Sequence, residues 1–245
     1  MLQITKPHID TKHLMTISPH NHYPDQLNTT QKMTGLALLV LTWFGIILQF
    51  CLSLKLSNPN RADIVSGVVT YFGFFTVTTN IFVALVLTLP AFSPSSHVGR
   101  FFARPQLLAC AATSIALVGL GYHFLLSEHW DPTGLQWLAD RLRHYVIPAA
   151  FCIYCLFFRP ATSLPWWSPF LWSAYPVLYF AYVLIRGEIL GIYPYHFIDV
   201  TAIGYAIALR NALGLWIGFI LAGWIFLGMS LLAGRYHPRL LSMSR

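Results

Sequence analysis

The sequence contains few charged residues. Asp, Glu, Lys and Arg make up 9% of its 245 residues, whereas ordinary soluble domains carry about 25%. Hydrophobic residues account for 56%, and the mean hydropathy is +0.61. Apolar runs occupy so much of the chain that a soluble domain of useful size has no room. The composition therefore predicts an all-α fold, a polytopic membrane protein.

The sequence is also poor in cysteine. All four cysteines, Cys51, Cys110, Cys152 and Cys155, lie inside apolar segments. Buried thiols at lipid level behave as small hydrophobic groups, so we expect no disulfide. The pair Cys152-x-x-Cys155 has the spacing of a redox motif, but it lacks a βαβ context. We interpret it as helix packing.

The first 32 residues lack the hydrophobic run of a signal peptide. They are polar and contain proline, and they are predicted to form a disordered cytoplasmic tail. A second, short basic tail is expected over residues 236–245. The first tail holds four histidines whose spacing fits no defined metal site, so no metal is expected; they are His8, His13, His20 and His22.

Six apolar segments are long enough to cross a bilayer, which takes roughly 20 residues. They cover residues 34–54, 64–89, 106–126, 133–158, 169–186 and 211–233. We expect a bundle of six transmembrane helices within residues 33–235. Residues 197–210 are apolar but short, and are interpreted as an interfacial or re-entrant segment before the last helix. A simple loop is the alternative.

The basic residues predict the orientation. Nine of the fifteen Lys and Arg residues fall on the side that would hold both termini, and six fall on the other. The positive-inside rule then predicts that both termini are cytoplasmic, in the inner membrane if the cell is bacterial. The formal net charge of +7 follows from this rule and from contact with anionic membrane lipids, so no nucleic-acid partner is needed.

The second segment carries an unusual polar stretch at its centre, Tyr71–Asn80 (YFGFFTVTTN). Thr76, Thr79 and Asn80 share one face at helical spacing. Hydrocarbon offers no partners to these groups, so the face is expected to turn toward other helices. Two interpretations stay open. The hydroxyls bond to their own helix or join two helices, or they form a functional site.

The fourth segment carries a histidine at a comparable depth. Thr76 and His144 each lie about twelve residues into their segments, hence ~18 Å along their helices. Pro148 cannot bond the carbonyl of His144, which predicts a kink and a free acceptor there. The Asp140 carboxylate, one turn before His144, can hold one imidazole nitrogen and raise the basicity of the other. Ionisable groups in membrane segments are functional candidates, with a structural histidine as the alternative.

Together these groups predict acyl-transfer chemistry. A threonine hydroxyl is a weak nucleophile unless a neighbouring base takes its proton, and His144 can be that base. The side-chain amide of Asn80, one turn from Thr76, can in principle donate to an oxyanion.

Three stretches resemble one family. FFTVTTN, RHYVIP and the run YPVLYFAYVLIRGEILGIYPYHFIDVTAIGY are similar to bacterial relatives of the androgen-induced and androgen-dependent six-helix membrane proteins, over roughly residues 64–232. Animal members are threonine hydrolases that cleave fatty acid esters of hydroxy fatty acids. The resemblance implies Thr76 as nucleophile, with Thr79 as the alternative, and His144 as the second essential residue. It places the family's aromatic outer motif on a stretch that includes Tyr195 and Phe197, as substrate-binding residues.

The leading hypothesis is therefore a cofactor-independent membrane hydrolase of lipid esters. Its acyl tunnel is expected among four aromatic residues, Phe72, Phe75, Tyr175 and Tyr179. A small-molecule carrier is the main alternative, because Pro148 and Pro176 supply the helix breaks that mark transporter binding sites. A haem protein with axial ligands His123 and His144 is a third, weakened by their different depths.

Overall fold

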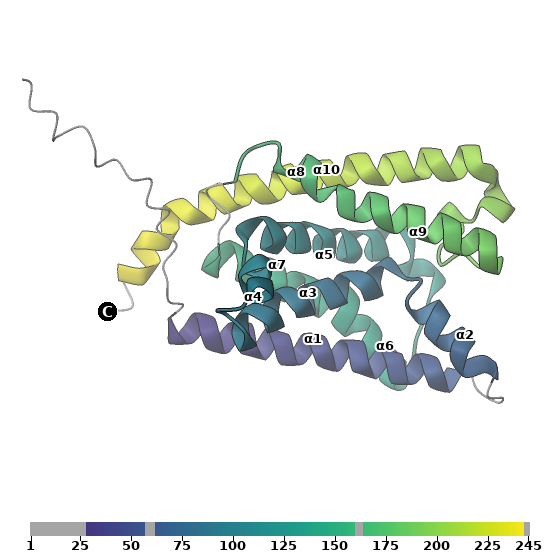
Figure 1. The fold of residues 1–245 in the computed structure, drawn as a ribbon, viewed down its shortest axis with the longest axis horizontal. Helices are drawn as coiled ribbons and strands as arrows, with labels where there is room; N and C mark the ends of the chain where they lie inside the picture. The colour runs from purple at the N-terminus through teal and green to yellow at the C-terminus, as the bar shows by residue number, and fades with distance from the viewer. Residues whose placement is uncertain (1–27, 57–61, 160–163, 243–245) are drawn as a thin grey trace, which may run out of the picture.

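The computed structural model describes residues 28–56, 62–159 and 164–242, and over these ranges it contains helices and no strand. The helices run side by side, and α1 begins at the end of the bundle where α10 finishes (Figure 1). The all-α prediction is confirmed for this part of the chain. Its α-helices are α1 (Thr29–Leu56), α2 (Ala62–Tyr71), α3 (Phe75–Phe92), α4 (His97–Phe102), α5 (Pro105–Leu125), α6 (Gly134–Arg141), α7 (Ile147–Phe158), α8 (Ser168–Trp172), α9 (Ala174–Leu190) and α10 (Val200–Ser242).

Five helical stretches of the described chain are long and apolar enough to cross a membrane: Thr29–Leu54, Phe75–Phe92, Pro105–Leu125, Ser168–Leu190 and Val200–Arg235. By length and composition they fit a multi-pass membrane protein. The region predicted as the fourth span is also helical, but its first half is polar and is split by a π-helical turn. The predicted tail over residues 1–32 lies almost wholly outside the described residues.

The first helix begins at Thr29, earlier than predicted, because a capping box starts it. The Asn28 side chain accepts a hydrogen bond from the Gln31 backbone N–H at 2.8 Å, and the Gln31 side chain accepts one from the Asn28 backbone N–H at 3.0 Å. This reciprocal pair satisfies two backbone donors that a helix N-terminus leaves free. The sequence Asn28-Thr-Thr-Gln31 carries that signal.

The prediction of one continuous helix over residues 64–89 is wrong. The chain leaves the helix after Tyr71, and α3 starts at Phe75, after Phe74 in an extended conformation (φ −84°, ψ 133°). A side chain at Gly73 would lie 3.1 Å from the guanidinium carbon of Arg186, so glycine gives that group room. Thr76 therefore stands in the first turn of a helix, at a break in the backbone.

Arg186 of α9 fixes this break. Its guanidinium donates to the Val69 carbonyl of α2 at 3.1 Å and to the Ile192 carbonyl at 2.9 Å, and its side chain is buried. The hydroxyl of Tyr179, also in α9, donates to the Gly73 carbonyl at 2.7 Å. Backbone carbonyls freed by the break thus find partners on α9, as buried carbonyls require.

Near Pro148 the chain does not simply kink. Residues Leu142–Val146 form a π-helical turn, and the Ile147 N–H bonds to the Leu142 carbonyl, five residues back. A π turn absorbs one extra residue, so the helix continues past the proline. A side chain at Gly119 of α5 would lie 3.1 Å from the His144 carbonyl oxygen, so α5 approaches this turn closely.

The last two helices have different bounds from the predicted fifth and sixth segments. In the sequence, Gly187, Gly191 and Pro194 predict a break after the fifth segment. Gly191 does end α9 in the left-handed conformation (φ 67°), whereas Gly187 stays helical. A side chain at Gly187 would overlap the Tyr193 ring, so this glycine serves close packing. The final helix begins at Val200, not at residue 211, and is interrupted at Gly204 (φ 76°).

The core lies where α3, α5 and α7 meet, with α1 and α10 packed around them. Five of its side chains, Val83, Ala111, Ile115, Phe151 and Phe219, are completely buried. By contrast α9 and α10 expose many large apolar side chains and lie together on one side of the bundle (Figure 1). Such a surface suits contact with lipid.

Candidate active site

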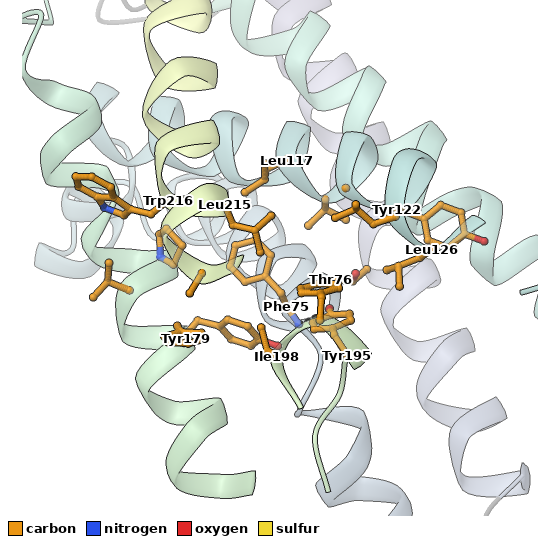
Figure 2. Close-up of a pocket in the computed structure, with 18 of the residues that line it drawn as sticks. Phe75, Thr76, Leu117, Tyr122, Leu126, Tyr179, Tyr195, Ile198, Leu215 and Trp216 are labelled. Carbon is orange, nitrogen blue, oxygen red and sulfur yellow. Dashed lines mark hydrogen bonds between the residues drawn. The ribbon is translucent and has the colours of Figure 1, made fainter. Parts of the chain in front are cut away.

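An apolar cavity of about 350 Å³ lies between α5, α9 and α10, and the first turn of α3 closes one end. Most of its wall consists of aliphatic and aromatic side chains. Figure 2 shows Trp216 and Leu117 on one side of this space and Thr76 with Tyr195 on another. Its lining residues are Phe75, Thr76, Leu117, Val118, Gly121, Tyr122, Leu125, Leu126, Pro176, Val177, Tyr179, Phe180, Tyr195, Phe197, Ile198, Leu209, Ala212, Leu213, Leu215 and Trp216.

Thr76 supplies one of the few polar groups of this wall. Its side chain is buried, and it lies next to the hydroxyl of Tyr195, which accepts a hydrogen bond from the Phe75 backbone N–H at 3.0 Å. The hydroxyls of Thr76 and Tyr179 also lie close to that of Tyr195. Three hydroxyls therefore meet at the N-terminus of α3, at the polar end of an otherwise apolar space.

Thr79, the alternative nucleophile, has a different environment. Its hydroxyl lies 3.1 Å from the hydroxyl of Tyr175 in α9, which in turn donates to Thr78 at 3.2 Å. Thr79 is completely buried and does not line the cavity. It joins α3 to α9, as small hydroxyl residues do between membrane helices.

The prediction that Asn80 offers its amide to an oxyanion receives no support from its geometry. The side-chain N–H donates to the Thr76 carbonyl at 2.8 Å, one turn back in the same helix. The amide oxygen is buried without a partner. Asn80 therefore tightens the first turn of α3 and holds the backbone of Thr76.

His144 and Asp140 do form the predicted pair. The imidazole Nδ1 lies 3.0 Å from one carboxylate oxygen of Asp140, and the Tyr122 hydroxyl donates to the other at 2.8 Å. The Tyr122 ring stacks on the imidazole, with centroids 3.8 Å apart and planes 6° apart. A carboxylate on Nδ1 fixes the tautomer in which Nε2 is the basic nitrogen.

Tyr122 joins the two halves of the candidate site. Its side chain lines the cavity that Thr76 also lines, and its ring stacks on the imidazole of His144. No hydrogen bond links Thr76 to His144 among the described residues. The structure thus places Thr76 in the wall of the cavity and His144 behind Tyr122 of the same wall, without joining the two directly.

A buried arginine completes the surroundings of Asp140. Arg143 donates to the Gln49 side-chain oxygen of α1 at 2.7 Å and to the Ala139 carbonyl at 3.2 Å. Gln136 donates to the same Gln49 oxygen at 3.0 Å. Sequence reasoning missed Tyr122 and Gln49, although a lone glutamine in the apolar run of α1 is a readable signal.

Both aromatic residues of the outer motif reach the cavity. The rings of Tyr195 and Phe197 stack with centroids 5.1 Å apart and both line the wall. Of the four aromatics expected in the tunnel, Phe75 and Tyr179 line it, whereas Phe72 and Tyr175 do not. Tyr175 packs against Phe75 from behind, with ring centroids 5.4 Å apart.

The two histidines of the haem alternative each have another partner. His123 is exposed with Nδ1 3.4 Å from the Tyr145 hydroxyl, and His144 is held by Asp140. Within the described ranges no group of three or more His, Cys, Asp or Glu side chains is placed to hold a metal ion.

Comparison of the chain with protein-family models, with curated proteins and with solved structures finds no match. The interpretation of this site therefore depends on its own geometry and chemistry.

Proposed function

We propose that this protein is an integral membrane hydrolase of fatty-acyl esters, with Thr76 as the nucleophile and His144 as the base. One observation carries the proposal. A hydroxyl at a helix N-terminus lines an apolar cavity, and a carboxylate-held imidazole lies behind one tyrosine of the same wall. Such a space suits an acyl chain, with its ester group at the polar end.

The position of Thr76 favours attack on a carbonyl carbon. The first turn of α3 carries backbone N–H groups without intrahelical partners, and the helix dipole is positive there. The Tyr195 hydroxyl accepts a hydrogen bond from one of these groups, the Phe75 N–H. An ester oxygen that takes this place would meet the N–H and the tyrosine O–H, which together can stabilise an oxyanion.

The proposed reaction has two steps. Thr76 Oγ1 bonds to the acyl carbon as His144 Nε2 takes its proton, and the proton then passes to the departing alcohol. Water next attacks the acyl-threonine ester with the same histidine as base, releasing the fatty acid and restoring Thr76. Proton transfer from Thr76 to His144 requires Tyr122 to move aside, because its ring covers the imidazole. Catalytic hydrogen bonds often form only in the substrate complex.

The proposed topology has six crossings. Besides the five apolar helices, the stretch Gly134–Phe158 would be an additional crossing. It begins polar, but it is continuously helical and long enough to span a membrane. Residues 197–210 would then lie at the outer interface before the last crossing, with both termini cytoplasmic. The similarity of FFTVTTN and RHYVIP to the threonine hydrolases of the androgen-regulated family supports Thr76 as the nucleophile, because the nucleophile of those enzymes also stands near the start of a helix.

A membrane carrier or binding protein is the second candidate. It is favoured by one observation, namely that the polar neighbour of Thr76 is Tyr195 and not the base. In that case the cavity would hold an amphiphile without changing it.

Labelling with a long-chain fluorophosphonate separates the two candidates. Wild type in detergent is compared with Thr76→Ala, His144→Ala and the matched control Thr79→Ala, and hydrolysis of a fluorogenic long-chain ester is measured beside it. Loss of labelling and turnover in the first two variants, with both retained in the control, is expected. A well-folded wild type that does not label would contradict the hydrolase and favour the carrier, and labelling that survives Thr76→Ala would exclude Thr76 as the nucleophile.

A further inference from the structure

A second, smaller cavity lies at the opposite end of the bundle from the Tyr195 loop. It has a volume of about 120 Å³ and opens between α1 and α3, with Tyr154 of α7 in its wall. This end carries the start of α1 and the end of α10 (Figure 1). We refer to it as the terminal crevice.

Two features of the sequence create the space. Gly35 of α1 faces Tyr154 so closely that a side chain there would lie 3.0 Å from the tyrosine oxygen. Pro90 lies inside α3 and lines the crevice, and a proline deprives the carbonyl four residues back of its helical donor. That carbonyl belongs to Val86, which also lines the crevice.

Two cationic side chains line the same crevice. Lys32 comes from the first turns of α1 and Arg159 from the end of α7. The only ion pair within the described ranges joins His144 to Asp140, so neither cation has a carboxylate partner there. The acidic residues of the described chain all lie in the other half of the bundle: Asp63, Glu128, Asp131, Asp140, Glu188 and Asp199.

The rest of the crevice wall is apolar. Leu36 and Leu39 of α1 face Leu87 of α3 across it, and Leu108 of α5 completes it. Leu36 is also one of the exposed apolar side chains, so the wall continues onto the outer surface of α1. Two cations without a carboxylate partner in the described ranges, above an apolar wall, match an anionic headgroup joined to an acyl chain.

We infer that the terminal crevice binds a phospholipid with an anionic headgroup, its phosphate between Lys32 and Arg159 and an acyl chain along Leu36 and Leu87. Phosphatidylglycerol is the simplest lipid of this class. Charge complementarity selects it over a zwitterionic lipid, whose ammonium group would face two cations. This site is separate from the cavity that contains Thr76, and binding there does not require ester hydrolysis.

Thermal unfolding of the purified full chain in detergent tests the inference. The melting temperature is followed during titration with dioleoyl phosphatidylglycerol, dioleoyl phosphatidylcholine or soluble glycerol phosphate. A ligand that binds only the folded protein raises this temperature in proportion to its occupancy. We expect a rise with phosphatidylglycerol at least about tenfold lower in concentration than with phosphatidylcholine, and none with glycerol phosphate.

Charge variants locate the site. The double variant Lys32→Gln/Arg159→Gln should weaken the phosphatidylglycerol response by about tenfold or more, since each basic residue contributes to attraction of anionic lipid. The charge-retaining variant Lys32→Arg/Arg159→Lys should keep it. The matched control, Arg104→Gln/Arg235→Gln, removes two charges at the same end outside the crevice and should also keep it.

Four results would overturn the inference. They are equal stabilisation by both phospholipids, no response from folded wild type, equal loss in the control double variant, and saturation by glycerol phosphate alone. The third would indicate diffuse attraction to anionic surfaces, and the fourth a site for soluble phosphate. None of these results depends on whether Thr76 is a nucleophile.

Discussion

Two irregular turns of the membrane helices position the two candidate catalytic side chains, and they differ in kind. At Gly73 the backbone leaves the helix, so α3 starts inside the bundle with the Phe75 N–H beside Thr76 bonded to a side-chain hydroxyl, that of Tyr195. At Leu142–Val146 the helix only widens into a π turn, and His144 stays buried with a carboxylate partner. A full break leaves a backbone donor to a side-chain partner at the cavity, whereas a π turn displaces a side chain and keeps its own backbone bonds.

The carboxylate beside the π turn should give the largest effect. Asp140→Ala removes the partner of both His144 and Tyr122 and leaves the Arg143 cation without a nearby negative charge, so we expect about 3 kcal/mol lower stability. Ester turnover should fall with it. Thermal unfolding in detergent measures the first, and a variant that unfolds at the wild-type temperature would show that the carboxylate is not structurally important. Asp140→Asn, which keeps the shape, should recover part of the stability.

The two glycines at the irregular turns provide a matched pair. Gly73→Ala places a methyl group 3.1 Å from the Arg186 guanidinium carbon, and Gly119→Ala places one 3.1 Å from the His144 carbonyl. Each should lower stability by about 1–3 kcal/mol through overpacking. Gly214→Ala, which would meet nothing within 4 Å, is the control and should be neutral or slightly stabilising.

The two glycine variants should differ in ester turnover. Gly73→Ala shifts the first turn of α3, so turnover should fall even at temperatures where the variant is folded. Gly119→Ala acts on a carbonyl rather than on the imidazole, so its turnover should fall less. Equal losses in both would mean that the break is no more important to the site than the π turn.

The hydroxyl of Tyr122 should have a smaller effect. Tyr122→Phe keeps the ring stacked on His144 and deletes the hydrogen bond to Asp140, which is worth about 1–3 kcal/mol when one partner is charged. If the hydroxyl orients the carboxylate, the pH profile of ester turnover should shift while binding of a non-hydrolysable ester analogue stays the same. An unchanged profile would assign Tyr122 a packing role only.

The smallest effect is expected at the far wall of the cavity. Trp216→Ala enlarges the space near Leu215, so longer acyl esters should gain relative to shorter ones, by about fourfold for each methylene newly buried. Competition between a short and a long fluorogenic ester measures this. The exposed Trp166→Ala, outside the cavity, is the control and should leave the ratio unchanged.

Several parts of the fold were readable from the chain. The long apolar runs, the glycine that ends α9 and the i, i+4 pairing of Asp140 with His144 all depend on local chemistry, and the structure contains each of them. The capping box at Asn28 was equally local and was overlooked. The break at Gly73 was not readable, because glycine is common inside membrane helices and gives no signal without its neighbour Arg186.

The candidate site divides in the same way. Spacing put Thr76, Thr79 and Asn80 on one face, which is correct for a helix but does not say what each side chain meets. Packing decided that Thr76 lines a cavity while Thr79 bonds to Tyr175, 96 positions away. Tyr122 could not be selected in advance, since its stacking on His144 depends on how α5 lies against the π turn.

By itself the sequence determined that this chain folds into apolar helices. Hydrophobic residues make up 56% of it and charged residues 9%, so its long apolar runs must be buried in a membrane or in a core. It also determined local pairs, since residues one helical turn apart meet whatever surrounds them. The tertiary structure alone decided which polar groups share a cavity. Hydrocarbon leaves buried hydroxyls and carboxylates to find partners on other helices, and only packing decides which helices those are.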